Sequence, residues 1–449
     1  MQSKSFNLNI NSTIKSFTKT IQVDSDKSLS IRSFLIGSIS QGISKAKNVL
    51  ESEDVYSAIN CLKKLGVKIK KNGPKSYIIY GKGLGSLFVK KDSQINFGNS
   101  GTLARLLIGI LSTTPEIEIK IQGDHSLNKR SMKKLINLMS RFGAEFLPKN
   151  KFKFPLKLIS TEMPINIKYQ SGVSAQLKSA VMLAGLNSYG ITEIIEKQES
   201  RDHTENILSK STHALKISKK KNKLIKIFGK KKLSPININI PGDPSSAAFF
   251  TALALLLGEN SFLKIKNVGL NPTRIGFYNL LKKHGAKIKF RNIKKNNNEI
   301  HGDIIVKGSK IKPLKASKDY YVNSTDEYPI LFVIAALTSG TSIFRGIGDL
   351  ANKESNRIKE MQKVLKQIGA RSIASKDKII IHGKSFFERK NKKINVPNLG
   401  DHRICMSTVI LALVTGIKTK ISNFETVNTS APSFLKIIKL LGGKYEIKK

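Results

Sequence analysis

A repeat that recurs six times constrains this chain more than any other feature of its sequence. At each recurrence a polar turn rich in Lys, Ser and Gly opens an almost wholly apolar helix, and successive openings lie 70 to 81 residues apart. Such a period indicates six copies of one supersecondary unit. The functional residues should therefore lie where the polar openings converge. The openings are at Ser28, Thr102, Gln176, Ser246, Glu327 and His402.

A second series of helices keeps the same period. These helices are amphipathic, and each ends at a small residue 38 to 42 residues after an opening. Short runs enriched in β-branched residues lie between the helices, so each unit is predicted to contain an apolar helix, a strand, an amphipathic helix and a strand. The small residues are Gly66, Gly143, Ala214, Gly285, Gly369 and Gly442, and the clearest strand runs are residues 77–80, 117–121, 236–240, 263–268 and 379–381.

A chain of 449 residues is too long for one ordinary core, and two domains of three repeats each are the natural division. A helix that is apolar all round must be buried on every side. We therefore expect an α/β protein in which one helix of each unit lies inside and the sheets lie outside. Domain crossings are predicted just before the first and fourth apolar helices. Residues 24–240 would then form a domain inserted into another that is built from residues 1–23 and 241–449.

The formal net charge of +47 would favour binding to nucleic acid. Lysines nevertheless occur in every repeat, and no aromatic residues alternate with them to stack on bases. We attribute most of the excess charge to the Lys-, Asn- and Ile-rich composition that an AT-rich genome encodes. Small anions are then the expected partners and nucleic acid is not, with a basic repeat protein that binds nucleic acid as an alternative.

The sequence predicts neither a targeting segment nor a membrane span. Residues 1–23 lack the apolar core of a secretory signal, and the longest apolar stretch, residues 247–257, is far shorter than the roughly 20 residues that cross a bilayer. We expect a soluble, cytoplasmic protein. Cys61 and Cys405 lie among apolar helical neighbours and are predicted to be buried, inert thiols.

No cofactor is expected from the sequence. The seven histidines lack the spacing of metal ligands, so no metal is predicted. The glycine-rich run at residues 81–85 lies between two strand-like runs. It is predicted to be a hairpin turn and not the loop of a dinucleotide site.

The polar openings suit the binding of anions. A helix start offers free backbone N–H groups, and most of the openings add hydroxyl donors and a nearby cation. Helix capping alone would account for Asp243 and Ser245. It does not call for Lys27, Arg32 or Arg403 beside apolar helices, and for these three we favour contact with a ligand.

Seven short motifs, in the same order along almost the whole chain, resemble those of the enolpyruvyl transferases. Among these enzymes they are similar to the 5-enolpyruvylshikimate-3-phosphate synthase family, and Ser-Ala-Gln and Arg-Asp-His-Thr-Glu are typical of its second, bacterial subclass. Each motif is weak alone, but seven in sequence are highly specific. They are Asp26-Lys27-Ser28 with Arg32, Gly98-Asn99-Ser100-Gly101-Thr102, residues 174–180, residues 200–205, Asp326-Glu327-Tyr328-Pro329, Lys353-Glu354-Ser355 with Arg357, and Asp401-His402-Arg403.

The resemblance implies a fold and a reaction. The fold has two inside-out α/β barrel domains that close on the substrates, each made of three repeated units with buried parallel helices and outer sheets. The reaction moves the enolpyruvyl group of phosphoenolpyruvate to the 5-hydroxyl of shikimate 3-phosphate and releases phosphate, in the shikimate pathway to chorismate and the aromatic amino acids. The enzyme would act as a monomer, without a metal or cofactor.

The resemblance also assigns ligand contacts, motif by motif. Planar guanidinium groups suit these substrates, because they bind phosphate and carboxylate groups through two parallel hydrogen bonds. Shikimate 3-phosphate would be held by Lys27, Ser28, Arg32, Ser174, Ala175, Gln176, Ser200, Arg201, Asp326 and Lys353. Phosphoenolpyruvate would be held by Lys27, Gly101, Arg130, Gln176, Arg357 and Arg403.

The reaction needs two proton carriers, because the methylene carbon of phosphoenolpyruvate must take a proton and the 5-hydroxyl must lose one. The resemblance makes Asp326 the base toward the 5-hydroxyl. It makes Glu354 the donor to, and later the acceptor from, the methyl group of the intermediate. Lys27 would assist as acid to the departing phosphate. If a helix has already begun at Glu354, then Glu354 and Arg357, three residues apart, share one of its faces and could meet one ligand; otherwise they are ordinary surface charges.

A sister enzyme that transfers enolpyruvyl to UDP-N-acetylglucosamine is the nearest alternative. It carries Lys-Asn where this chain has Lys27-Ser28, and a cysteine on a mobile loop near Arg130 where this chain has His125. The chain also departs from the pattern that it resembles. Thr429 stands where many relatives carry a lysine near the phosphate, so one cationic contact is not matched.

Overall fold

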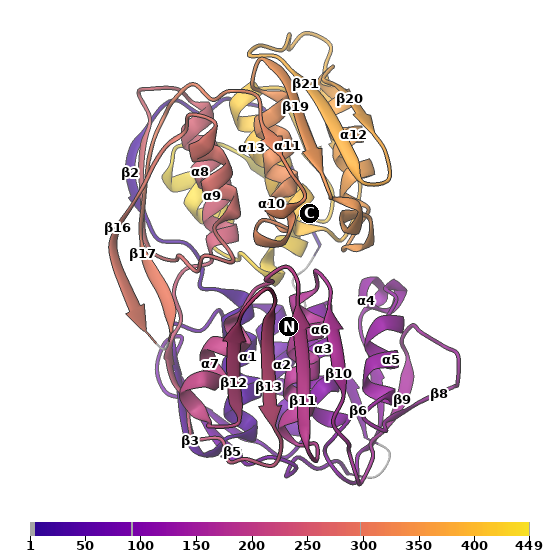
Figure 1. Ribbon diagram of the computed structural model, residues 1–449. Coiled ribbons are helices and arrows are strands. Elements are labelled where there is room, and N and C mark those ends of the chain that lie inside the picture. The colour runs from indigo at the N-terminus through magenta and orange to yellow at the C-terminus, as the bar shows by residue number, and fades with distance from the viewer. Residues whose placement is uncertain (1–4, 91–92, 297, 449) are drawn as a thin grey trace. The chain divides into compact units, whose positions relative to one another are not determined.

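Six four-stranded sheets reproduce the sequence repeat in the computed structural model, which describes residues 5–90, 93–296 and 298–448 (Figure 1). In each sheet the first two strands are parallel, and the recorded pairs of the other two are antiparallel. A typical repeat therefore contains a strand, a buried helix, a strand, an amphipathic helix and two further strands. The prediction of helix, strand, helix and strand was incomplete, because it left out the two strands at the edges of each sheet; among the predicted strand runs only residues 236–240 contain such an edge strand.

The chain forms two compact units. The inserted unit contains residues 25–240 and 295–299, and the discontinuous unit contains residues 5–24, 241–294 and 300–448. The sequence assigned residues 295–299 to the discontinuous domain, but they group with the inserted unit. The reason is that Glu299 accepts a hydrogen bond from Asn206 (3.1 Å) and lies 2.8 Å from Nδ1 of His203.

Three repeats make up the inserted unit. The first contains β14 (Asn237–Asn239), α1 (Lys27–Ile39), β3 (Gln41–Lys47), α2 (Glu53–Lys64), β4 (Lys68–Lys71) and β5 (Tyr77–Lys82). The second contains β6 (Gln94–Asn96), α3 (Gly101–Leu111), β7 (Glu118–Gln122), α4 (His125–Lys129), α5 (Lys133–Ser140), β8 (Glu145–Leu147) and β9 (Leu156–Ile159). The third contains β10 (Lys168–Ser171), α6 (Ala175–Leu186), β11 (Ile191–Glu196), α7 (His203–Ser211), β12 (Leu215–Lys219) and β13 (Lys223–Phe228).

Three more repeats make up the discontinuous unit. The fourth contains β2 (Thr18–Ile21), α8 (Pro244–Leu256), β15 (Phe262–Gly269), α9 (Gly276–Lys283), β16 (Lys287–Asn296) and β17 (Glu299–Lys307). The fifth contains β18 (Lys315–Ala316), α10 (Asp319–Asn323), α11 (Tyr328–Ala336), β19 (Gly340–Arg345), the 3₁₀ turn η1 (Gly348–Asn352), α12 (Arg357–Gln367), β20 (Arg371–Ala374) and β21 (Lys378–Gly383). The sixth contains β22 (Lys393–Val396), α13 (His402–Thr415), β23 (Lys418–Ile421), η2 (Phe424–Thr429), α14 (Phe434–Leu440), β24 (Glu446–Lys448) and β1 (Asn7–Ile10).

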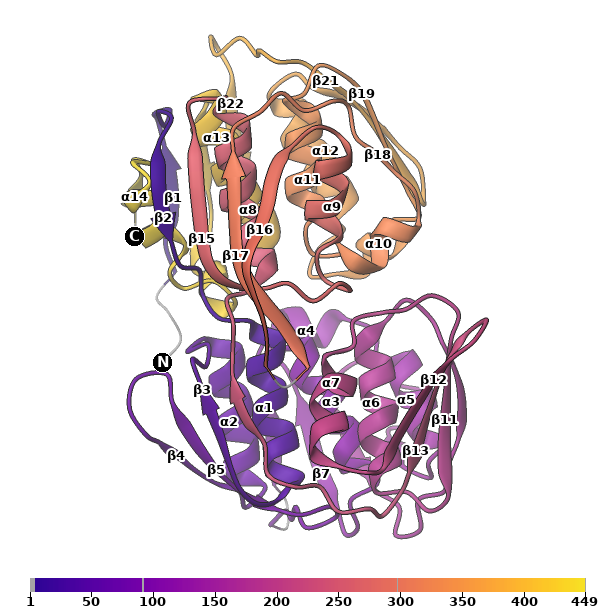
Figure 2. The same cartoon turned by 60° about the vertical axis from the view of Figure 1, so that its left-hand side comes forward.

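The apolar helices fill the inside of each unit and the sheets lie outside, which confirms the predicted fold. Helix α3 packs against α1 and α6 between the sheets of the inserted unit (Figure 2). In the discontinuous unit α8, α11 and α13 pack against one another, and every residue of α11 is buried. Burial on all sides explains why these sequences lack a polar stripe.

Serine residues occur in the buried helix α1 without leaving unsatisfied hydroxyl groups. Ser30, Ser33 and Ser38 each donate to a backbone carbonyl three or four residues earlier, at 2.7 to 2.8 Å. A hydroxyl that bonds to its own helix needs no water. Serine residues in this helix are therefore compatible with burial.

The small residues that end the amphipathic helices have a common backbone geometry in five of the six repeats. Gly66, Gly143, Gly285, Gly369 and Gly442 all have positive φ, between 82° and 106°. This left-handed region favours glycine and ends a helix sharply. The third repeat ends differently, because α7 stops at Ser211 before Ala214 is reached.

The glycine-rich run at residues 81–85 is not a hairpin turn, contrary to the prediction. Strand β5 ends at Lys82 and pairs with β3 and β4, whereas the next strand, β6, pairs with β7 in another sheet. The run therefore connects the first repeat to the second.

The amino-terminal segment completes two sheets of the discontinuous unit. Strand β1 lies between β23 and β24, and β2 pairs in parallel with β15. Strand β14 plays a similar part in the inserted unit, where it pairs with β3. The first strand of a repeat is thus supplied from a distant part of the chain at each domain crossing.

Three predictions about composition can be compared with the described residues. No helix among them is long and apolar enough to span a bilayer. Within the same ranges no group of three or more His, Cys, Asp or Glu side chains is arranged to hold a metal ion. Cys61 and Cys405 are buried free thiols, as predicted, and burial raises the pKa of Cys61 to about 12.

Four repeats place a glycine where the last strand passes over the end of the buried helix. A Cβ atom on Gly81, Gly229, Gly308 or Gly383 would lie only 1.6 to 2.2 Å from a backbone carbonyl oxygen at or just beyond that helix end. No atom can approach a carbonyl so closely, so these positions need glycine for space.

We predict that Gly229→Ala lowers the free energy of unfolding by about 1–3 kcal/mol, because the added methyl would lie 1.7 Å from the carbonyl oxygen of Ser188 and the backbone must shift. The midpoint of urea unfolding measures the loss. Gly172→Ala is the control, because a Cβ there meets nothing within 4 Å. Equal midpoints for the two variants would contradict this packing argument.

Candidate active site

The amino-terminal ends of the buried helices meet within each unit. In the inserted unit Gln176 of α6 donates to Thr102 of α3 (3.0 Å), and Arg32 of α1 donates to Ser179 of α6 (3.2 Å). In the discontinuous unit Ser245 of α8 donates to Glu327 at the start of α11. Arg357 lies between Asp326, just before α11, and Asp401, just before α13, so the polar openings converge in two groups of three, one group in each unit.

Short polar side chains cap these helices. Asp26, Ser100 and Ser174 each accept the backbone N–H of the residue three positions later. A cap of this kind satisfies one of the four N–H groups that a helix start leaves without an intrahelical partner. The remaining groups, with the positive end of the helix dipole, suit an anion.

Lys27 and Arg32 lie on the first turns of α1. The ammonium group of Lys27 lies 2.9 Å from Asp54 on the first turn of α2, and both side chains are largely buried. Arg32 donates to the carbonyl of Ser28 (3.1 Å) and the hydroxyl of Thr204 (2.9 Å). Ser28 is half-buried between them. Two cations are thus held at the start of one buried helix.

Gly101 is closely approached by two guanidinium groups. A Cβ at this position would lie 2.7 Å from Nη1 of Arg105 and 3.2 Å from Nη1 of Arg130. Arg130 donates to Asn99 (2.5 Å), and Arg105 donates to Gln176 (2.7 Å). The lack of a side chain at Gly101 therefore lets both cations reach the start of α3.

The remaining predicted residues of the inserted unit lie on α6 and before α7. Ser174 and Ala175 begin α6 and are half-buried, like Gln176. Ser200 is completely buried, and its N–H and hydroxyl both donate to Glu196 at 3.1 and 2.7 Å. Arg201 follows it and is half-buried.

Arg357 is the centre of the discontinuous unit's polar cluster. It is completely buried and binds three carboxylates: Asp401 through Nε (3.0 Å), Glu354 through Nη2 (2.6 Å) and Asp326 near Nη1 (3.6 Å). Burial opposes its charge, but Asp401, Glu354 and Asp326 raise the pKa of Arg357 above its ordinary value. The two predicted proton carriers, Asp326 and Glu354, thus share one guanidinium.

Arg403 has two guanidinium nitrogens without a hydrogen-bond partner among the described residues, whereas Arg357 has one. The side chain of Arg403 is buried, and among the described residues neither Nε nor Nη1 has a hydrogen-bond partner. The guanidinium carbon lies 5.9 Å from the centre of the Phe249 ring. A buried cation in this state has hydrogen bonds to offer to an anionic ligand.

Lys353 does not join the Arg357 cluster in this structure. Its ammonium group donates to Asp349 (2.7 Å), which also accepts from Tyr321 (3.0 Å). Lys353 adjoins Glu354 in sequence, but its side chain is held by the 3₁₀ turn η1.

Several residues of these clusters were missed by sequence reasoning. Asp54 holds Lys27, Asn99 holds Arg130, and Asp401 holds Arg357. Asn99 and Asp401 stand inside motifs that were recognised, and their position at a helix start was the available signal. Asp54 has a weaker signal, an acidic residue in the first turn of an amphipathic helix.

The fold and these clusters define the class of protein. The enolpyruvyl transferase NikO from Streptomyces tendae has a similar fold: it is 13% identical, and the match covers 99% of each chain with a TM-score of 0.75. At this identity the likeness concerns the fold alone. The architecture is that of the enolpyruvyl transferases.

More similar proteins define the family. The family model "EPSP synthase (3-phosphoshikimate 1-carboxyvinyltransferase)" matches residues 12–438. A 3-phosphoshikimate 1-carboxyvinyltransferase of Paramagnetospirillum magneticum is 36% identical over 425 residues, 94% of each chain. An EPSP synthase structure from Acinetobacter baumannii is 32% identical, with a TM-score of 0.84 over 99% of this chain and 100% of that one. This chain belongs to the EPSP synthase family.

We predict that Arg357→Met lowers the free energy of unfolding by about 3–5 kcal/mol at neutral pH, because three carboxylates lose their shared cation. Without the cation the carboxylates repel one another in the folded variant, and acid relieves this repulsion because it reduces their negative charge. The deficit relative to the wild type should therefore shrink between about pH 7 and pH 4.

Urea unfolding at several pH values tests this expectation. Lys363→Met on the same helix is the control, because Lys363 is exposed and pairs only with Glu360 among the ion pairs of the described residues. A deficit that stays constant with pH would show that carboxylate repulsion does not explain the loss.

Proposed function

We propose that this protein catalyses the reaction for which its relatives are named, the transfer of enolpyruvyl from phosphoenolpyruvate to the 5-hydroxyl of shikimate 3-phosphate, with release of phosphate. Family membership over nearly the whole chain supports the reaction. The observation that carries the residue assignment is the buried Arg357, which holds the carboxylates of both Asp326 and Glu354. The product leads to chorismate and the aromatic amino acids.

The inserted unit supplies most contacts to shikimate 3-phosphate in this proposal. Its negative groups suit the cations and N–H groups at the starts of α1 and α6. Arg32 is assigned to the phosphate, because its guanidinium is held near the start of α1 by hydrogen bonds to Ser28, Ser179 and Thr204. The other assigned residues are Lys27, Ser28, Ser174, Ala175, Gln176, Ser200, Arg201, Asp326 and Lys353.

Phosphoenolpyruvate is assigned to the cations of both units. Arg130 approaches Gly101 at the start of α3, where two guanidinium groups gather. Arg403 is buried with unused hydrogen-bond donors, and Arg357 keeps its Nη1 without a hydrogen bond among the described residues. Lys27 and Gln176 complete the set. Guanidinium groups orient a carboxylate or phosphate as well as neutralising it.

Two carboxylates carry the proton transfers. The oxygen of the 5-hydroxyl attacks C2 of phosphoenolpyruvate while Asp326 takes the proton of that hydroxyl. Glu354 gives a proton to C3, so that a methyl group forms. Glu354 then takes a proton back from that methyl group while the C2–O bond to phosphate breaks. Both carboxylates must be positioned for this exchange, and their contacts with Arg357 support such a role.

Lys27 is proposed as the acid toward the departing phosphate. Its ammonium group is held by Asp54 at 2.9 Å, which fixes its position at the start of α1. A positioned cation also stabilises the negative charge that develops on the leaving group. The monomeric state stays a prediction from the family resemblance, and the cytoplasmic location stays a prediction from the sequence.

Release of phosphate from phosphoenolpyruvate tests the proposed function directly. We expect release with shikimate 3-phosphate and none with UDP-N-acetylglucosamine. Release with only the UDP-sugar would assign the sister activity. No release with either acceptor, together with tight binding to duplex DNA at physiological salt, would favour the basic repeat protein.

We predict that Glu354→Gln lowers the turnover number by about 100- to 10,000-fold, because a positioned general acid–base contributes that much. Binding of shikimate 3-phosphate, measured by calorimetry, should change little. Glu360→Gln is the matched control on α12, which begins three residues after Glu354, since Glu360 pairs with the exposed Lys363. Turnover of Glu354→Gln near the control value would remove Glu354 from the mechanism.

We predict that Arg403→Met raises the KM for phosphoenolpyruvate about 10- to 100-fold, because hydrogen bonds to a charged partner are lost. The KM for shikimate 3-phosphate should change much less. Arg389→Met serves as control, because Arg389 is exposed in the same unit. An unchanged KM for phosphoenolpyruvate would refute the assignment of Arg403.

A further inference from the structure

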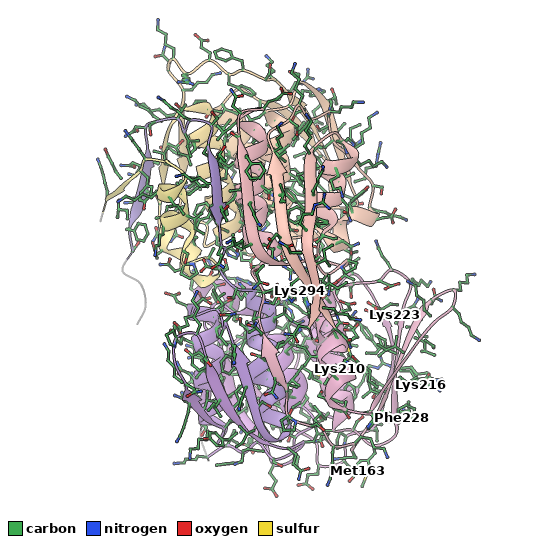
Figure 3. The ribbon with its side chains drawn as sticks, turned by 90° about the vertical axis from the view of Figure 1, so that its left-hand side faces the viewer. Met163, Lys210, Lys216, Lys223, Phe228 and Lys294 are labelled. Atoms are coloured by element: carbon green, nitrogen blue, oxygen red, sulfur yellow. The ribbon has the colours of Figure 1, made fainter. Side chains whose placement is uncertain are left out.

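Four charged residues form a buried cluster in the third repeat, outside the set of assigned ligand contacts. This buried quartet consists of Lys178 on α6, Glu196 on β11, Glu205 on α7 and Lys223 on β13. The ammonium group of Lys178 lies 2.9 Å from Glu196 and 2.6 Å from Glu205. Lys223, labelled in Figure 3 at the start of β13, lies 3.6 Å from Glu196 and 3.5 Å from Glu205.

Burial of these charges demands an explanation. All four side chains are 0 to 8% exposed, and moving ions out of water costs free energy that their mutual attraction seldom exceeds. Two cations and two anions balance, so the quartet adds no net charge to attract a substrate. Burial opposes the ionisation of Glu196, but Lys178 and Ser200 lower the pKa of Glu196 and keep it charged.

The quartet holds Ser200 at three atoms. Glu196 Oε1 accepts from the backbone N–H of Ser200 (3.1 Å) and from its hydroxyl (2.7 Å). Lys178 donates to the carbonyl oxygen of Ser200 (3.3 Å). The turn that carries Ser200 and Arg201 between β11 and α7 is therefore fixed by charged partners at every polar atom of Ser200.

The same contacts extend to Arg32. Lys178 and Ser179 are neighbours on α6, and Glu205 and Thr204 are neighbours on α7. Helices α6 and α7 are thus joined by two adjacent contacts, the Lys178–Glu205 ion pair (2.6 Å) and the hydrogen bond between the hydroxyls of Ser179 and Thr204 (2.8 Å). Arg32 donates to both of these hydroxyls. Three helices are locked together at their first turns.

We infer that the buried quartet positions Ser200, Arg201 and Arg32 for the anionic acceptor substrate, shikimate 3-phosphate. Its members are positioning residues, since they act through the groups that they hold. This inference rests on the proposed function. A charged cluster suits the task because its hydrogen bonds are stronger and more directional than those of neutral groups, so the turn keeps one conformation.

The test uses Glu196→Gln, which keeps the shape and removes the charge. We expect the KM for shikimate 3-phosphate to rise about tenfold, because a charge-assisted hydrogen bond to Ser200 weakens. The KM for phosphoenolpyruvate and the turnover number should change less than about twofold. Glu193→Gln on the same strand is the control, because Glu193 pairs with Lys226 at the surface.

A double-mutant cycle separates positioning from general destabilisation. If Glu196 acts through Ser200, Glu196→Gln has less effect on the KM for shikimate 3-phosphate in a Ser200→Ala background than in the wild type. The inference would be overturned if the fold-changes of the two single variants in the KM for shikimate 3-phosphate multiply in the double variant. Equal changes in the KM values for shikimate 3-phosphate and phosphoenolpyruvate would overturn it as well. If Glu196→Gln does not fold, Lys223→Gln takes its place, because Lys223 makes the longer ion pairs at the edge of the quartet.

The wild type separates this inference from the proposed function. A wild-type enzyme that releases no phosphate with shikimate 3-phosphate contradicts the proposed function itself. An active wild type whose Glu196→Gln variant matches the Glu193→Gln control contradicts only the positioning role. Calorimetric titration of shikimate 3-phosphate alone gives a second readout, in which the variant should bind about tenfold more weakly.

Discussion

A helix that is apolar on every side can present polar groups only at its ends, and the architecture follows from this constraint. The sheets cover the flanks of α1, α3 and α6 in one unit and of α8, α11 and α13 in the other. Caps, hydroxyls and guanidinium groups then gather at the amino-terminal ends, because the positive end of the helix dipole and the free N–H groups lie there. The location of the clusters is therefore a result of how the core is packed.

The buried charged side chains are arranged differently in the two units. In the inserted unit the quartet of Lys178, Glu196, Glu205 and Lys223 is balanced and serves as a rigid support. In the discontinuous unit three carboxylates surround one guanidinium, and Arg403 has donors without acceptors nearby among the described residues. An enzyme whose substrates are small anions can use both features, the rigid quartet of the inserted unit and the hydrogen-bond donors of Arg403 in the discontinuous unit.

Much of the fold could be predicted from the sequence, because each repeat contains patterns that depend only on neighbouring residues. Apolar helices and their glycine stops need only neighbouring residues to be recognised, and five of six stops have the left-handed geometry that glycine favours. The outer strands of each sheet were harder to predict. A short run such as Lys315–Ala316 carries little signal of its own, and it becomes a strand only because β19, almost 30 residues later, pairs with it.

The candidate site could be predicted residue by residue only where a motif was matched. Resemblance named Lys27, Arg130 and Arg357, but it did not assign a role to Asp54, Asn99 and Asp401, which contact them. Asp54 and Glu196 reach their partners from other elements, and no spacing in the sequence brings Glu196 next to Ser200 and Lys178 at once. Such contacts depend on how three helices and a sheet pack, which is a property of the folded chain.

The place of β1 in the sixth sheet has a consequence for biosynthesis. Leu8 pairs with Ile421 on one side and with Ile447 on the other, so this strand has no neighbours until the ribosome has made nearly the whole polypeptide. The inserted unit needs nothing later than β14 for its three sheets, and it can fold while translation continues. Until β23 and β24 are made, the backbone N–H and C=O groups of β1 lack their sheet partners, and unpaired strand edges are prone to aggregation.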